Sequence, residues 1–307
     1  MKKIVLVAGG YGFIGRNIAR AFKSAGFEVW AIGHGVWAKN EEDQWGIDRW
    51  IQGDITLDRL SVINTKPAVI INCAGSSSVK ASFDDPLIDF RKTLDSTTAL
   101  LEFIRLKAPE AKLIQLSSPA VQGRHADTPI KIDDVWDPVS PYGLHKSFAE
   151  KLCFFYSKTY GLNIAIIRFF SLYGPGLKKQ LLWDACCKIK EGQPIVAFGG
   201  SGNETRDWLY VDDAVQLVLT VAQDNDSKGM VFNGGSGRRC TVAEALLKVV
   251  QAFGVSTKII FNHRSRPGDP HFYQADIEGS LKLGWSPSVS LEDGIGWYVE
   301  WFKKEVV

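Results

Sequence analysis

The chain has 307 residues, 45% of them hydrophobic, which is enough for one large domain or two coupled lobes around a sizeable core. Its 36 Lys and Arg residues nearly balance 34 Asp and Glu residues, so neither nucleic acid nor an anionic membrane is expected as the main partner. No stretch of about 18 apolar residues could cross a bilayer, and the stretch after Met1 is too short for a secretory signal. We therefore expect a cytoplasmic protein. Five cysteines without metal-like spacing predict reduced, buried thiols and no metal site.

Strands and helices alternate along the first half of the chain. Apolar stretches bounded by turn residues predict strands over residues 3–8, 27–32, 50–52, 68–73, 112–116 and 163–169. Helical spacing of apolar residues lies between them, at 13–26, from Phe90 to Ile104, and after Pro141. This alternation predicts an α/β fold with a Rossmann-type, doubly wound parallel sheet.

In the second half of the chain, predicted strands and helices alternate less regularly. Helices are predicted near 181–191, 212–223, 241–253 and 291–303, and a short strand at 207–211. We interpret residues 1–172 as the first domain and 173–307 as a smaller, discontinuous α/β lobe. Part of 207–234 is expected to return to the first domain, because no linker-like stretch separates the two.

A glycine-rich turn joins the first predicted strand to the first predicted helix. Gly9 permits the tight turn, Gly12 lets the backbone approach a pyrophosphate, and Gly15 lets the helix pack close to the strand. Phe13 and Ile14 begin the helix, whose free N–H groups attract phosphate. The pattern predicts a dinucleotide site.

The end of the second strand leaves the choice between NAD and NADP open. An acid that binds the ribose 2′-hydroxyl is usual there, but this chain has His34 between two glycines. His34 is either a plain loop residue or a contact to the ribose or a 2′-phosphate. Further on, Asp54 and Ile55 are expected at the adenine, and Ala74 beside the cofactor.

Tyr142 and Lys146 are four residues apart, which places them on one face of the predicted helix. A neighbouring ammonium favours the phenolate of a tyrosine that is otherwise a poor base at neutral pH. Ser118 ends the fifth strand, at the sheet edge where ligands of such folds bind. It is expected to hold a substrate hydroxyl while Tyr142 moves its proton. His145, between them in the sequence, is expected at the surface.

Several motifs occur together along nearly the whole chain. They are the glycine loop, Asp54-Ile55, Ser117-Ser118, Tyr142-Gly143 with Lys146, the segment from Arg168 to Pro175, Thr205-Arg206-Asp207-Trp208, Val211-Asp212-Asp213, and Arg266-Pro267-Gly268-Asp269. With this combination the chain resembles the extended short-chain dehydrogenases/reductases of the nucleotide-sugar epimerase/dehydratase group.

The resemblance implies roles for particular residues. Ser118, Tyr142 and Lys146 match the catalytic triad of that family. The residues that match its substrate contacts are Ser171, Arg206 and Arg266, which correspond to positions at the diphosphate, and Asp269, which corresponds to a nucleoside contact. The resemblance also implies a homodimer, formed through the helices near 87–107 and 141–160.

The chain departs from the family pattern at several positions. Ser171, Thr93 and Gln122 stand where the family often has Asn, Asn and Tyr. Pro119 and Ala120 stand where 4,6-dehydratases have an Asp-Glu pair, so 4,6-dehydration is not expected.

The sequence therefore favours a nucleotide-sugar C4 epimerase that oxidises C4 transiently with bound NAD or NADP. One alternative is an NAD(P)H-dependent 4-keto-6-deoxy nucleotide-sugar reductase, which the missing acid after the second strand favours. An alternative of another class is a non-catalytic dinucleotide-binding scaffold, against which the intact Ser118, Tyr142 and Lys146 argue.

Overall fold

A computed structural model describes residues 2–306 apart from 77, 124–125, 265–267 and 269–270. Its centre is a seven-stranded sheet in the order β10-β6-β5-β4-β1-β2-β3, and every adjacent pair of strands is parallel. The strands are β1 (Ile4–Ala8), β2 (Glu28–Gly33), β3 (Arg49–Gln52), β4 (Val69–Asn72), β5 (Lys112–Ser117), β6 (Asn163–Phe169) and β10 (Val231–Gly234). The predicted Rossmann-type fold is thereby confirmed.

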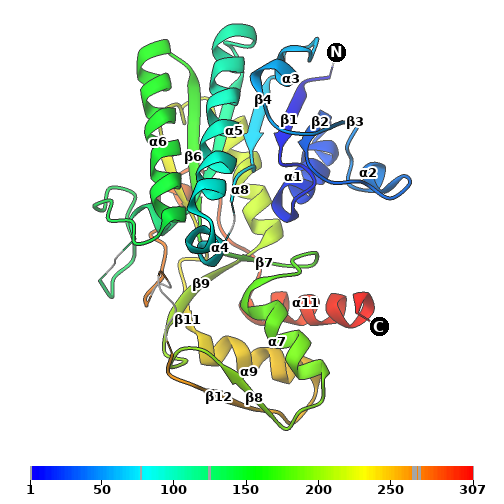
Figure 1. The fold of residues 1–307 in the computed structure, drawn as a ribbon, viewed down its shortest axis with the longest axis vertical. Helices are drawn as coiled ribbons and strands as arrows, with labels where there is room; N and C mark the ends of the chain where they lie inside the picture. Colours follow the sequence, from blue (N-terminus) through cyan, green and yellow to red (C-terminus); the bar gives the residue numbers. More distant parts are fainter. Residues whose placement is uncertain (1, 77, 124–125, 265–267, 269–270, 307) are drawn as a thin grey trace.

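Helices cover both faces of this sheet (Figure 1). One face packs against α1 (Phe13–Ser24) and α8 (Val211–Gln223), and the other against α3 (Leu57–Ser61), α5 (Pro86–Lys107) and α6 (Pro141–Tyr160). Alternate residues of β1 supply the two cores: Val5 and Val7 join one, Leu6 and Ala8 the other. Burial on both faces explains why the strands are continuous apolar stretches.

The remaining elements form a smaller lobe at the carboxyl ends of the strands (Figure 1). Its helices are α7 (Gln180–Lys190), α9 (Val242–Phe253) and α11 (Leu291–Glu305). Two small sheets complete it: β7 (Ser171–Tyr173), β9 (Thr205–Tyr210) and β11 (Arg239–Thr241) form one, and β8 (Ile195–Phe198) pairs with β12 (Lys258–Phe261) in the other. Short helices α2 (Glu41–Gln44), α4 (Val79–Asp84) and α10 (Glu278–Lys282) lie in the connections.

The chain leaves the main sheet after β6 and later returns to it. Helix α8 packs against α1, and β10 pairs with β6 at the edge of the sheet. We propose a domain boundary between residues 172 and 173. Helix α8 and strand β10, although later in the sequence, then belong to the first domain. In the part of the chain that the structure describes, no helix is both long and apolar enough to cross a membrane.

Candidate active site

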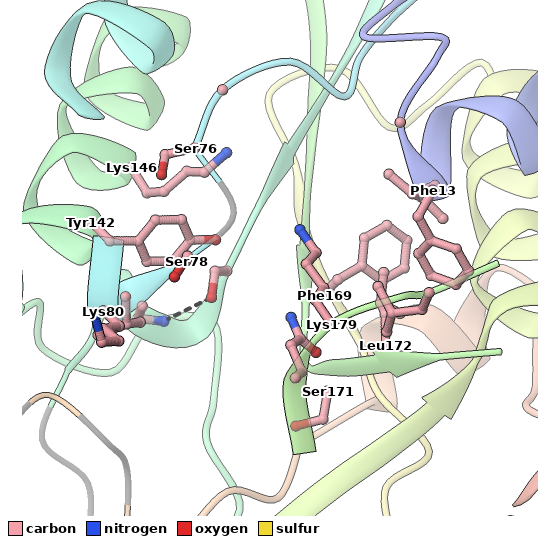
Figure 2. A pocket seen from close by; sticks show the side chains of 18 of the residues that line it. Phe13, Ser76, Ser78, Lys80, Tyr142, Lys146, Phe169, Ser171, Leu172 and Lys179 are labelled. Carbon is pink, nitrogen blue, oxygen red and sulfur yellow. Dashed lines mark hydrogen bonds between the residues drawn. The ribbon is translucent and has the colours of Figure 1, made fainter. Parts of the chain in front are cut away.

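A cavity of about 1450 Å³ opens between the main sheet and the smaller lobe. Its lining comes from the glycine loop, the ends of β4 and β5, the start of α6, and residues of β7, α7 and β9. Figure 2 shows Tyr142 and Lys146 on one wall, facing Phe169, Ser171 and Lys179 across the space. The cavity lies at the carboxyl ends of the parallel strands, the position where open α/β sheets bind their ligands.

The glycine loop has the geometry of a phosphate cradle. Gly9 has a φ of +81°, and a Cβ there would lie 2.9 Å from the backbone nitrogen of Ala74. A Cβ on Gly15 would lie only 2.3 Å from the carbonyl oxygen of Gly9. Gly12 caps α1 without a side chain, so the first N–H groups of the helix keep their capacity for an anion. The loop therefore fits a dinucleotide pyrophosphate.

The other residues predicted to contact a cofactor surround this loop. Phe13, Ile14, Ile55 and Ala74 all line the cavity. His34 and Asp54 also line it, and Nε2 of His34 lies 2.8 Å from Oδ1 of Asp54. The sequence reasoning did not anticipate that these two residues contact each other.

Local sequence fixes the position of Tyr142. Helix α6 begins with Pro141, and the Ser140 hydroxyl caps it by accepting from the Gly143 N–H at 3.1 Å. The Tyr142 N–H donates to the Ser82 hydroxyl at 3.0 Å, which joins α6 to α4. Ser118, directly after β5, forms a side-chain hydrogen bond with the Tyr142 phenol.

Lys146 lies one turn further along α6 and is buried. Its Nζ donates to the Leu116 carbonyl at 3.3 Å and lies 5.9 Å from the centroid of the Tyr142 ring. The structure therefore brings Ser118, Tyr142 and Lys146 together at one wall of the cavity.

Burial dominates the electrostatics of this wall. It raises the pKa of Tyr142 to about 12, against the hydrogen bond from Ser118, which lowers that pKa, while the charge of Asp89 raises it further. Burial also lowers the pKa of Lys146, and the charge of Asp89 opposes this shift. At neutral pH the phenol is therefore protonated in the protein alone, and it needs nearby positive charge to act as a base.

The expectation that His145 lies at the surface is wrong. The residue is 7% exposed, and its Nδ1 lies 2.6 Å from Oδ2 of the buried Asp89 on α5. The ring also makes an edge contact with Phe90, at 5.3 Å between centroids. No local pattern predicts this pairing, because the two residues are 56 positions apart.

Two of the other predicted substrate contacts also line the cavity. Ser171 and Arg206 line the cavity, and Nη1 of Arg206 donates to the Thr205 carbonyl at 2.9 Å. Arg266 and Asp269 lie outside the described residues. Other cationic residues also line the cavity, among them Lys179 and Arg264, which belong to no motif that the sequence reveals. Among the described residues, no three His, Cys, Asp or Glu side chains gather as a metal site would require.

Comparisons with known proteins agree with this geometry. The chain is 29% identical to a UDP-glucose 4-epimerase of Mycolicibacterium smegmatis, with 98% of both chains covered. It is 27% identical to a dTDP-glucose 4,6-dehydratase of Xanthomonas campestris, covering 97% of this chain and 92% of that protein. A Bacillus cereus UDP-glucuronic acid 4-epimerase, solved with UDP-glucuronic acid and NAD, superposes with a TM-score of 0.87 at 26% identity, covering 98% and 99% of the two chains.

A sequence profile identifies the family, whereas the individual relatives include both epimerases and dehydratases. The profile of the NAD dependent epimerase/dehydratase family matches residues 5–235. This match includes the glycine loop, Ser118, Tyr142, Lys146 and Arg206. The chain belongs to the NAD-dependent epimerase/dehydratase family.

Proposed function

We propose that the protein is a nucleotide-sugar C4 epimerase, in which Ser118, Tyr142 and Lys146 are the catalytic residues. The observation that carries the proposal is the half-buried Tyr142 side chain, whose phenol is hydrogen-bonded to Ser118 and lies one helical turn from Lys146, on a cavity that the glycine loop also lines. Such a cavity has room for a dinucleotide at one end and a sugar nucleotide at the other.

The three residues divide the proton chemistry among them. Ser118 holds the 4-hydroxyl of the sugar, and Tyr142 removes the proton from it and later returns it. Lys146 supplies the positive charge that favours the phenolate against the effect of burial. The nicotinamide cofactor, when bound, supplies the acceptor and then the donor of one hydride at C4. The glycine loop would hold its pyrophosphate, with Phe13, Ile14, Ile55 and Ala74 around it.

The residues after Ser118 support epimerisation over dehydration. Pro119 and Ala120 are buried and form a short 3-10 helix with Val121. Water loss from the sugar needs an acid and a base near C5 and C6, and this helix contributes neither. A chain with Pro119 and Ala120 at these positions is therefore suited to return the hydride to C4.

A 4-keto-6-deoxy nucleotide-sugar reductase is the second candidate. It would use the same three residues in the return direction only, with an exchangeable NADPH. The observation that favours it is the absence of an acid directly after β2, where His34 stands. A non-catalytic scaffold would have no need for a Tyr142 that lines the cavity and is bonded to Ser118.

We also propose a homodimer through α5 and α6. Phe90, Phe148 and Phe155 are 40%, 37% and 55% exposed, and they line one apolar groove between the two helices together with Leu94 and Leu152. Large exposed aromatic side chains gathered on two parallel helix surfaces are typical of an interface.

A substrate panel tests the proposed function. The purified protein is incubated with UDP-, GDP-, CDP- and dTDP-sugars, with and without added NADPH, and the products are separated by chromatography. The proposal predicts interconversion of C4 epimers without net use of cofactor. Oxidation of NADPH only with 4-keto sugars would support the reductase instead, and binding of cofactor without any turnover would support the scaffold.

A further inference from the structure

We propose that the chain selects NAD over NADP with a carboxylate from a neighbouring strand: Asp54, held by His34, replaces the acid that is missing after β2. The inference rests on the proposed function only in that the glycine loop holds a nicotinamide dinucleotide. It extends that proposal by naming the residues that distinguish a ribose 2′-hydroxyl from a 2′-phosphate.

The strand register brings the two residues together. Gly33 pairs with Gln52 across β2 and β3, and the Gly53 N–H donates to the Gly33 carbonyl at 2.8 Å. His34 directly follows β2 and Asp54 follows β3 after Gly53, and their side chains meet at 2.8 Å between Nε2 and Oδ1. The sheet thus carries a carboxylate beside the end of β2 although no acid follows β2 in the sequence.

The pair is accessible to a ligand. The side chains of His34 and Asp54 are 75% and 77% exposed, and both line the cavity together with Gly9 and Gly12 of the phosphate cradle. A carboxylate at this position accepts a hydrogen bond from a ribose hydroxyl. It repels a 2′-phosphate, which carries close to two negative charges at neutral pH.

Two arginines of this region, Arg16 and Arg59, are engaged in other contacts. Arg16 donates twice to the Tyr11 carbonyl, from Nε at 3.2 Å and from Nη2 at 2.7 Å. Arg59 donates from Nη1 to the Gln52 carbonyl at 2.6 Å. Neither arginine is among the described residues that line the cavity. The Arg59 guanidinium lies beside Gly53, where a Cβ would come within 2.6 Å of its Cζ. A 2′-phosphate would therefore meet the Asp54 carboxylate, and Arg16 and Arg59 would have to give up the hydrogen bonds above to turn toward it.

Aromatic rings hold Arg16 in its contacts with Tyr11. The guanidinium of Arg16 lies 5.1 to 5.4 Å from the ring centroids of Tyr11, Trp37 and Trp45, and its side chain is only 19% exposed. The Tyr11 ring lies across Gly35, where a Cβ would come within 2.4 Å of it. Moving Arg16 to a phosphate would break both hydrogen bonds to Tyr11 and open this cluster.

Binding of the two reduced cofactors tests the proposal without any sugar. The protein, freed of nucleotide that co-purifies, is titrated with NADH and NADPH, and the bound fraction is followed by nicotinamide fluorescence. The natural chain should bind NADH at least tenfold more tightly than NADPH. Asp54→Asn should reduce this ratio about tenfold, mainly through tighter NADPH binding, because it removes the repelling charge and keeps the shape. Asp58→Asn removes an exposed charge outside the cavity lining and should leave the ratio unchanged.

The outcomes separate this inference from the proposed function. Equal or tighter binding of NADPH by the natural chain, or an unchanged ratio in Asp54→Asn, would overturn the role of the pair. Such a result would leave epimerisation untouched, since the titration involves no sugar. Failure to bind either nucleotide would instead overturn the proposed function itself, together with the inference that rests on it.

Discussion

At the scale of single residues, the proposed chemistry depends on one half-buried phenol. Tyr142 is the group whose proton must move, and burial raises its pKa to about 12, far from the pH at which a base is useful. Sequence spacing was sufficient to predict that Tyr142 and Lys146 share a helix face. It could not predict the Asp89–His145 pair behind them, because that contact depends on how α5 and α6 pack.

Tyr142→Phe removes the proton carrier and leaves the ring in place. We expect kcat to fall by at least about 10³-fold, while the affinity for NADH stays within about twofold. Steady-state kinetics measure kcat, and fluorescence titration of the same preparation measures the affinity for NADH. Retention of more than about a tenth of the activity would contradict the proposed mechanism.

The pH dependence of the rate tests the role of Lys146. Positive charge stabilises the phenolate, so removing it in Lys146→Met should raise the pKa of Tyr142. The rise of kcat with pH should therefore move to higher pH in this variant. Lys158→Met removes a charge from an exposed position of the same helix and should not move it. The profile of kcat is measured from pH 6 to 10 for both variants. If kcat rises at the same pH in both, this role for Lys146 is excluded.

At the scale of elements, α6 is tied to the sheet by a buried ion pair. Glu150 accepts from Arg168 of β6 at 3.0 and 2.8 Å and from Ser117 of β5 at 2.5 Å, so one carboxylate joins three elements next to the active site. The alternation of strands and helices was predictable because apolar periodicity is local. The β8–β12 pair was not, because each strand has four residues and the partners are about 60 positions apart.

Arg168→Met leaves the buried Glu150 carboxylate without its partner. We expect a loss of about 3–5 kcal/mol in the free energy of unfolding, because the charge stays buried and is no longer compensated. Arg105→Met breaks an exposed pair with Glu102 and should cost less than about 1 kcal/mol. Urea unfolding followed by circular dichroism compares the two variants, and equal losses would show that the buried pair does not anchor α6.

At the scale of the whole molecule, the chain builds one cavity from two interleaved parts. The glycine-rich turn after β1 gave an indication of this, because Gly9 and Gly12 line the cavity. Which edge of the sheet receives β10 was not predictable, since edge pairing depends on contacts far apart in sequence. The proposed dimer also belongs to this scale, because only the packed α5 and α6 create its groove.

Charge placed in that groove should separate the subunits. We expect light scattering to give twice the 34.0 kDa of one chain for the natural protein at micromolar concentration, and close to 34.0 kDa for Phe148→Asp with Phe155→Asp. Leu247→Asp, at a 50% exposed position of α9, is the matched control and should remain dimeric. A natural protein that is monomeric throughout this range would contradict the proposed interface.

The fate of the hydrogen at C4 tests the account most directly. A sugar nucleotide that the protein interconverts is prepared with deuterium at C4 and followed by nuclear magnetic resonance in ordinary water. If the hydride leaves and returns inside one closed site while Tyr142 handles only the hydroxyl proton, both epimers keep the deuterium at C4. Replacement of the label by hydrogen from water would show that C4 loses a proton instead, and would contradict the proposed mechanism.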